Sequence, residues 1–272
     1  MPTQTEKAAR FLDSHHGETP LLMPNAWDRG SARLLASLGF AALATTSSGL
    51  AATLGQLDGS VPRDESISHA GWLAADTDLP VSADLENCYA DSPDGVAQTV
   101  RLAIEAGLAG CSIEDYSGRP DAGLYDLALA TERVAAAAQI AHSGPVHLVL
   151  TARAENYLRG NRDLADTIAR LQAYQEAGAD VLYAPSITAP DDLREIVRSV
   201  DRPVNVLARP GVPPIAELAE IGVARVSVGG AFAFTALGAL AQAGRELLER
   251  GSYGYWDLAG PGAKAAHAAF AR

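Results

Sequence analysis

The sequence has few cysteines and little positive charge. Two cysteines occur in 272 residues, which excludes a framework of disulfide bonds and leads us to expect a reducing, cytoplasmic compartment. The chain has 33 acidic and 21 basic residues and no basic stripe, so we expect no nucleic-acid partner. An acidic chain of this kind needs a cation or a few buried arginines if it is to hold an anionic substrate.

Targeting segments and long runs of large apolar residues are also missing. Residues 1–17 are polar and charged, which is not the pattern of a signal peptide. Residues 226–244 carry no charge, but they contain many small residues and predict a buried strand followed by a buried helix, not a membrane span. No linker or low-complexity tract interrupts the sequence. We therefore expect one domain over residues 1–272 and no membrane partner.

Eight short apolar segments separated by helical stretches predict a single (β/α)8 barrel of the TIM type. Segments of this kind are buried on both faces in parallel sheets, and eight strand–helix units fit a chain of this length. We expect the barrel over about residues 20–245 and a helical extension over about 246–272. One strand opens the series at residues 21–24, and three others begin with a Pro-Val pair at residues 80, 145 and 203. The remaining four follow glycines that end helices, at Gly39, Gly107, Gly178 and Gly222.

Acidic residues follow two neighbouring strands of the predicted barrel at the end where active sites lie. Asp84 and Glu86 are two residues apart, so both side chains point the same way, and Glu114 ends the next strand. Three carboxylates in an apolar barrel mouth repel one another unless a cation joins them. Oxygen ligands without histidine or cysteine favour Mg²⁺, or Mn²⁺, over zinc. The pattern predicts a metal site, with ordinary rim acids as the alternative.

Other strand ends supply candidate substrate-binding groups. Arg153 ends the fifth strand, where its guanidinium is suited to a substrate carboxylate or phosphonate; an ion pair with Glu155 or Glu114 is the alternative. The turn of residues 47–50 offers backbone N–H groups and a hydroxyl to a second substrate oxygen. Cys88 lies two residues beyond Glu86, but no activating base is visible beside it. None of the six histidines falls at the rim, so none is predicted as a general base.

Taken together, these segments resemble the isocitrate lyase/phosphoenolpyruvate mutase superfamily over about residues 21–234. The resemblance rests on Pro24-Asn25-Ala26-Trp27-Asp28, Thr46-Ser47-Ser48-Gly49-Leu50, Ser82-Ala83-Asp84-Leu85-Glu86, Ile113-Glu114-Asp115, Thr151-Ala152-Arg153 and Val204-Asn205-Val206-Leu207. It implies a barrel, a magnesium ion and enolate chemistry on 2-oxo acids. It also implies homotetramers, or homodimers, in which a C-terminal helix is exchanged between subunits.

The resemblance also implies roles for individual residues. It makes Asp84 the direct metal ligand, Asp58, Glu86 and Glu114 the groups that hold the metal's waters, and Arg153 the substrate clamp. The turn that binds the substrate carboxylate corresponds to Ser48, Gly49 and Leu50. With these, we predict Trp27, Asp28, Ser47 and Asn205 as further substrate-binding residues.

Two segments depart from the superfamily. Its lyases carry a cysteine and its phosphonomutases a lysine and an asparagine in the loop after the fourth strand, and residues 115–121 contain none of these. We expect this loop to gate the site and to supply catalytic groups from Tyr116, Ser117 and Arg119. The stretch that is usually glycine-rich after the third strand reads Asn87-Cys88-Tyr89-Ala90.

Three functions follow from these observations. The first is a magnesium-dependent lyase that cleaves a carbon–carbon bond, including by decarboxylation, in a small 2-oxo or 2-hydroxy carboxylate through an enolate. The second is a mutase or hydrolase of the phosphorus–carbon bond, acting on phosphoenolpyruvate or phosphonopyruvate. The third is a 2-oxo acid binding protein with little turnover.

Overall fold

Nine parallel strand segments form one sheet in the computed structural model, which describes residues 2–271. The two edges of this sheet are β1 (Leu21–Met23), which pairs with β9 (Arg225–Ser227), and β2 (Asn25–Ala26), which pairs with β3 (Leu43–Thr45). Only Pro24 separates β1 from β2 in the chain. Proline has no N–H to donate to a strand ladder, so it divides one strand into two segments that close the sheet on itself. The predicted (β/α)8 barrel is confirmed.

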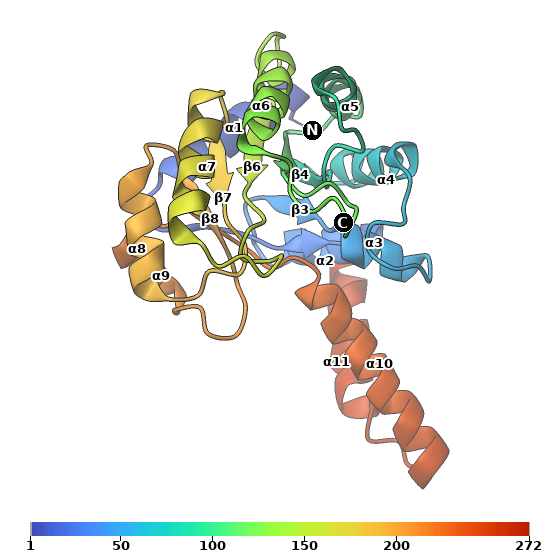
Figure 1. The fold of residues 1–272 in the computed structure, drawn as a ribbon. Coiled ribbons are helices and arrows are strands. Elements are labelled where there is room, and N and C mark those ends of the chain that lie inside the picture. The colour runs from blue at the N-terminus through green and yellow to red at the C-terminus, as the bar shows by residue number, and fades with distance from the viewer. Residues whose placement is uncertain (1, 272) are drawn as a thin grey trace.

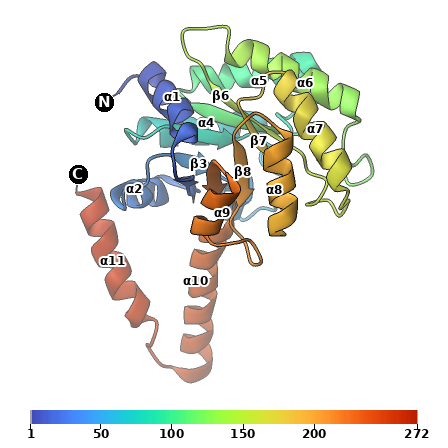
Figure 2. The same ribbon diagram turned by 90° about the vertical axis from the view of Figure 1, so that its left-hand side faces the viewer.

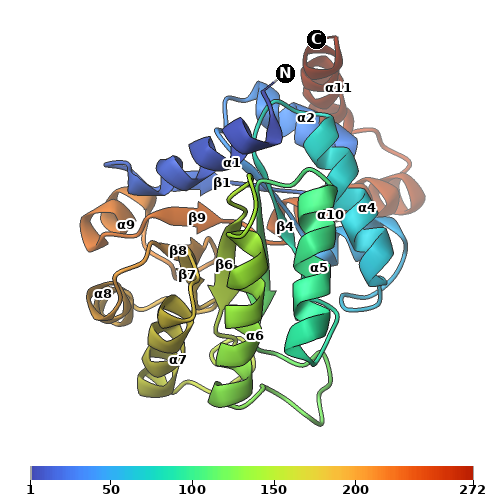
Figure 3. The ribbon, with the colours of Figure 1, turned by 90° about the horizontal axis from the view of Figure 1, so that it is seen from above.

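The helices surround the barrel in alternation with the strands (Figures 1 and 3). The remaining strands are β4 (Val81–Asp84), β5 (Gly110–Glu114), β6 (Val149–Arg153), β7 (Val181–Tyr183) and β8 (Val204–Leu207). The helices around them are α1 (Gln4–Asp13), α2 (Arg29–Ser37), α3 (Ser47–Thr53), α4 (Arg63–Ala75), α5 (Pro93–Glu105), α6 (Leu127–Ala141), α7 (Leu164–Glu176), α8 (Pro190–Ser199) and α9 (Ile215–Ile221). Two strands start later than predicted, because β6 begins at Val149 and not at the Pro145-Val146 pair, and β3 begins at Leu43 and not directly after Gly39.

The glycines that were predicted to end helices have the expected conformation. Gly39, Gly107, Gly178 and Gly222 have φ angles of 95°, 87°, 104° and 95°. Residues with a Cβ atom rarely adopt this left-handed region. Each of these glycines therefore lets the chain turn directly from a helix into the following strand.

The α1 helix covers the end of the barrel opposite the predicted site. Phe11 is fully buried there, and a Cβ atom on Gly110 would lie 2.7 Å from its ring. The Lys7 ammonium donates to the carbonyl oxygen of Ala74 at 3.0 Å. This end of the barrel is thus closed by packing, and the loops at the other end are left to form the site.

The last two helices, α10 (Ala231–Arg250) and α11 (Trp256–Phe270), project from the barrel as a helical hairpin (Figures 1 and 2). Only α11 returns to the barrel, where it contacts α2. The expectation of a buried helix after residue 226 is wrong: Ala233 is the one buried residue of α10, and Leu240 is 68% exposed. The predicted boundary at about residue 246 falls inside α10. Among the described residues, no helix is both long and apolar enough to cross a membrane.

Candidate active site

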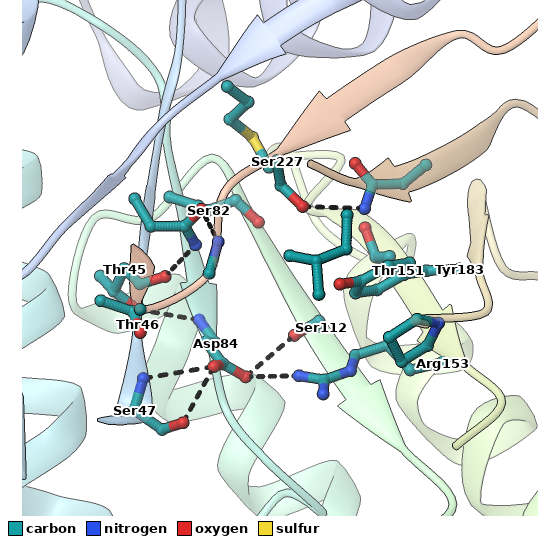
Figure 4. A pocket seen from close by; sticks show the side chains of 18 of the residues that line it. Thr45, Thr46, Ser47, Ser82, Asp84, Ser112, Thr151, Arg153, Tyr183 and Ser227 are labelled. Carbon is teal, nitrogen blue, oxygen red and sulfur yellow. Dashed lines mark hydrogen bonds and ion pairs between the residues drawn. The ribbon is translucent and has the colours of Figure 1, made fainter. Parts of the chain in front are cut away.

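A cavity of about 190 Å³ opens among the carboxyl ends of the barrel strands (Figure 4). It is smaller than the pockets that hold drug-sized ligands, which have volumes of roughly 300 Å³ or more. Most of the residues that line it are polar, and all nine strand segments of the barrel contribute lining residues. The lining includes Ser47, Asp84, Ser112, Arg153, Tyr183 and Asn205. The site therefore fits a small polar molecule.

Asp84, at the end of β4, lies at the centre of the polar contacts in this cavity. Its Oδ2 accepts hydrogen bonds from the backbone N–H and the hydroxyl of Ser47, at 3.2 and 3.1 Å. Its Oδ1 accepts from Arg153 Nη1 at 2.9 Å and from the Ser112 hydroxyl at 3.5 Å. The carboxylate is thus held in one orientation at the cavity wall, as Figure 4 shows.

Arg153, at the end of β6, joins three carboxylates. Its guanidinium contacts Asp84, then Glu114 at 3.1 Å, and Glu155 at 2.7 Å. Burial would lower the pKa of Arg153, but these three carboxylates raise it well above its ordinary value. The ion pair that the sequence offered as an alternative role for Arg153 is therefore present, while the same side chain also lines the cavity.

The cluster around Arg153 has more acids than bases. Arg159 is the second arginine, at 3.5 Å from Glu114 and 3.2 Å from Glu155. Burial, ahead of the repulsion from Glu155 and Asp84, raises the pKa of Glu114 well above its ordinary value although Arg153 lowers it. Burial, followed by the charges of Asp84 and Asp58, raises the pKa of Glu86 to about 7. The carboxylates exceed the guanidinium groups, so a bound cation would relieve their repulsion.

The predicted metal carboxylates lie in one region but do not converge on a point. Asp58 and Asp84 line the cavity. Glu86 lies beside it, because its backbone N–H donates to Asp84 Oδ1 at 3.5 Å, and Glu114 lies beside it because it contacts Arg153. Among residues 2–271, these four do not form a group whose ligand atoms all lie within 4.8 Å of one another. As these side chains lie, no three of the four carboxylates could contact one ion directly. The all-oxygen donor set and the excess negative charge fit magnesium.

The rim beside Asp84 has an unusual backbone. Glu86, Cys88 and Tyr89 have φ angles of 50°, 57° and 56°, in the left-handed region that glycine favours. This is the stretch in which the sequence departs from the glycine-rich pattern. Non-glycine residues in that region cost about 1–3 kcal/mol each, so the segment is strained where it carries Glu86.

Of the predicted substrate-binding residues, Ser47, Ser48 and Asn205 line the cavity. Residues 47–50 do not form an open turn, because they are the start of α3, which Thr46 caps through its side chain. Gly49 is required there, since a Cβ atom would lie 2.5 Å from Thr46. The Asn205 amide donates to the Ser227 hydroxyl at 3.0 Å.

The structure does not bring Trp27, Asp28 and Leu50 to this cavity. They line a separate hollow of about 480 Å³ between α2, α3 and α4. Asp28 caps α2, where its Oδ1 accepts from the N–H of Ser31 at 2.6 Å. Its carboxylate is therefore engaged at a helix end, which is a common role for an aspartate in that position.

The loop after β5 also lies outside the cavity lining. Tyr116 forms a bridge with Leu124, and the Arg159 guanidinium lies 3.5 Å from the centre of its ring. Ser117 is buried, and Arg119 pairs with Asp91 at 3.1 Å. The gating and catalytic roles of Tyr116, Ser117 and Arg119 stay predictions.

Cys88 packs into the main hydrophobic core. Burial raises the pKa of its thiol to about 12, so the thiol stays protonated at neutral pH.

Several cavity residues were not predicted from the sequence. Ser112 and Thr151 each precede a rim residue by two positions, and a period of two places both on the interior face of a strand. Tyr183 ends β7, and Arg153 lies 5.4 Å from the centre of its ring. The sequence pattern could have identified these residues, because each is a polar or aromatic residue at an interior position near the end of a predicted strand.

Comparisons with known proteins find a matching family model and several similar proteins. The family model described as phosphoenolpyruvate phosphomutase matches residues 11–248. A solved structure of a proposed lyase/mutase from Burkholderia cenocepacia is 50% identical, with a TM-score of 0.91, and the match covers 93% of this chain and 92% of that one. An uncharacterized protein of Mycobacterium tuberculosis is 40% identical over 80% of this chain and 81% of its own length. The 2-methylisocitrate lyase of Escherichia coli is 29% identical over 78% and 73%.

Proposed function

Because the chain belongs to the phosphoenolpyruvate phosphomutase family, within the isocitrate lyase/phosphoenolpyruvate mutase superfamily, we propose that it is a magnesium-dependent carbon–carbon lyase. Its substrate would be a small 2-oxo or 2-hydroxy carboxylate. The proposal rests on the acid-rich cluster around Asp84 and Arg153, at the wall of a small cavity whose lining residues are mainly of polar types.

Asp84 would bind the magnesium ion directly, and Asp58, Glu86 and Glu114 would bind its water ligands. When bound, the ion supplies a positive charge that stabilises the enolate oxygen formed as the neighbouring bond breaks. Manganese offers the same oxygen-binding chemistry.

Arg153 would hold the carboxylate of the substrate. Its Nη1 donates to Asp84 at 2.9 Å, while Nε and Nη2 are engaged by Glu155 at 3.1 and 2.7 Å. A substrate carboxylate in the cavity would accept from Nη1 in place of Asp84. Glu155 keeps the guanidinium oriented during this exchange because it holds the other edge of the same plane.

Tyr183 would donate a hydrogen bond to a reacting oxygen. Burial raises its pKa to about 12, although Arg153 lowers it, so the phenol keeps its proton at neutral pH. Among residues 2–271, no cysteine, lysine or histidine lines the cavity. The hydroxyl groups of Tyr183 and of the serines and threonines in the lining are therefore the neutral O–H donors of this site.

The family model favours phosphorus–carbon chemistry as the second candidate. Phosphonomutases of the superfamily carry a lysine in the loop after the fourth strand, but lysine occurs in this chain only at Lys7 and Lys264. Lys7 is buried at the opposite end of the barrel and Lys264 is exposed on α11. This absence argues against the phosphorus–carbon reaction, although the loop cysteine of the lyases is missing from residues 115–121 as well.

A substrate screen separates these candidates. We would incubate the protein with Mg²⁺ and 2-oxo and 2-hydroxy mono- and dicarboxylates, phosphoenolpyruvate and phosphonopyruvate, following substrate loss and thermal stability. Cleavage of a carboxylate supports the lyase, and new phosphorus NMR signals from the phosphorus compounds would replace it with the mutase. A carboxylate that raises the melting temperature by mass action without turnover would support the 2-oxo acid binding protein.

We also propose that the chain forms a homodimer or homotetramer in which α10 and α11 pack on another subunit. Leu240, Leu248 and Trp256 are 68%, 88% and 63% exposed in the single chain. Several large exposed apolar side chains on one hairpin are unusual on a monomer, where large exposed apolar patches mark interaction sites.

A further inference from the structure

Two histidines and an aspartate form a cluster at the end of the barrel opposite the cavity. His142 is the residue that ends α6, His147 lies in the loop that leads into β6, and Asp180 immediately precedes β7. The late start of β6 leaves His147 outside the strand, where its ring stacks on that of His142. Because both β6 and β7 begin here, the cluster is separated from the candidate active site by the length of the strands.

The three side chains converge. His142 Nε2 lies 3.0 Å from Asp180 Oδ2, and His147 Nε2 lies 3.0 Å from Oδ1. Among the described residues, this is the one group of three or more potential metal-ligating side chains whose ligand atoms all lie within 4.8 Å of one another. The backbone also holds the Asp180 carboxylate in place, because the N–H of Leu150 donates to its Oδ2 at 2.8 Å.

We propose that His142, His147 and Asp180 bind a divalent transition-metal ion of the zinc class, separately from the magnesium site. Two imidazole nitrogens and one carboxylate oxygen are ligands that zinc, nickel and copper accept, whereas magnesium prefers oxygen alone. Three protein ligands leave one position of a tetrahedral ion for water.

The ligand atoms must shift to hold one ion. Bonds of roughly 2.0–2.1 Å in a tetrahedral site place neighbouring ligand atoms roughly 3.4 Å apart. Each imidazole nitrogen now lies 3.0 Å from a different oxygen of Asp180, and the ligand atoms of the three residues all lie within 4.8 Å of one another. The rings are nearly parallel, at 12° and 4.1 Å between centroids, so they must tilt for both Nε2 lone pairs to meet one ion. The two side chains are 29% and 42% exposed, which leaves room for that movement.

The surroundings favour a positive ion. Asp180 is 8% exposed, and a largely buried carboxylate gains more from a cation than an exposed one. The site also lies at the carboxyl end of α6, where the helix dipole favours positive charge. An ion here would tie the end of α6 to the starts of β6 and β7, and would therefore stabilise the folded barrel by mass action.

The test is zinc binding by tag-free, full-length protein, measured by calorimetry with excess Mg²⁺ to occupy the oxygen-rich site. We expect the wild type to bind one zinc ion per chain, and Asp84→Asn to bind it equally well. His142→Ala/His147→Ala should lose more than about tenfold in affinity, which is about 1.4 kcal/mol. His16→Ala, which removes an exposed histidine elsewhere, is the matched control and should bind as the wild type does.

A second variant and a spectrum distinguish the loss of a zinc ligand from misfolding of the variant. His147→Ala alone removes the more exposed ligand and should weaken zinc binding while leaving the circular dichroism of the metal-free protein unchanged. X-ray absorption of the zinc-loaded wild type should show two imidazole ligands. The proposal is overturned if the wild type binds no zinc at about 100 µM, a concentration at which even a weak site is filled, or if the double variant binds it undiminished.

Discussion

At the scale of single residues, Tyr183 is the neutral donor that the sequence did not reveal. Its phenol lines the cavity beside Arg153 and keeps its proton at neutral pH. We expect Tyr183→Phe to lower kcat by about 10²-fold, the effect of removing one hydrogen-bond donor to a developing oxyanion. Steady-state kinetics on the substrate found in the screen measure this. An unchanged kcat in a folded variant would remove Tyr183 from the mechanism.

His15 gives a prediction on stability. It is buried in the 3-10 helix η1 (Ser14–His16), where its Nδ1 lies 2.7 Å from the Phe11 carbonyl oxygen and its Nε2 lies 3.0 Å from Arg225. Because arginine only donates, His15 Nε2 accepts and the ring is neutral. Burial, followed by the charge of Arg225, lowers its pKa from 6.5 to about 3.

The sign of the pH dependence follows from that shift. Below about pH 6.5 the unfolded chain protonates His15 and the folded protein does not until about pH 3, so stability falls as the pH falls through this window. Between pH 7 and 5 the loss attributable to His15 is about 2 kcal/mol. Urea unfolding measures the free energy of unfolding at pH 7 and at pH 5. Between these two pH values, His15→Gln should lose less of this free energy than the wild type does, by the amount attributed to His15. The exposed His16→Gln should lose as much as the wild type. Equal losses in His15→Gln and wild type would contradict the assignment.

At the scale of elements, Asp115 joins three parts of the barrel. Its carboxylate accepts from Arg170 and Tyr174 of α7, at 3.1 and 2.7 Å, and from the N–H of Glu155 after β6, at 2.9 Å. These contacts hold the segment that follows Glu114 and the segment that carries Glu155, so they position the acids around Arg153.

Removal of Asp115 should therefore destabilise the fold. Asp115→Ala leaves the largely buried Arg170 without this partner, and loss of one member of a buried ion pair costs about 3–5 kcal/mol. Equilibrium denaturation measures the change, with the exposed Asp121→Ala of the same loop as the control. If the two variants lose the same free energy of unfolding, Asp115 does not have the positioning role assigned to it.

The elements differ in how far the sequence could predict them. Glycine stops and Pro-Val starts mark the strands because these residues have specific backbone requirements, and alternation along each strand then places Asp84, Glu114 and Arg153 at one rim. The α3 helix was taken for a turn because seven residues are too few to show helical periodicity. Asp28 was assigned to the substrate because a capping aspartate and a binding aspartate look alike until the helix after it is seen.

At the scale of the whole molecule, the sequence could not show where α10 lies. Its small and apolar residues suit burial, but composition does not tell whether the covering surface belongs to the same chain or to another. In the single chain the large apolar residues of α10 are exposed. The same limit applies to the cluster of His142, His147 and Asp180, which only the fold brings together.

The proposed assembly gives a prediction on mass. We expect sedimentation of the wild type to give a multiple of the 28.3 kDa chain. Leu240→Glu/Leu247→Glu places two charges on one face of α10, because residues seven apart share a helix face, and should yield single chains. Gln242→Glu, on the opposite face, is the control and should leave the assembly intact. A wild type that sediments as a single chain would refute the proposed exchange.

We propose above all that Asp84 holds a magnesium ion against a small carboxylate. The most direct measurement is turnover of the best carboxylate from the screen by wild type and by Asp84→Asn, each with Mg²⁺ and with EDTA. We expect turnover only in the wild type with Mg²⁺, and we expect the folding and the zinc affinity of Asp84→Asn to be unchanged. Turnover by Asp84→Asn, or by the wild type in EDTA, at the rate of the magnesium-loaded wild type would contradict it.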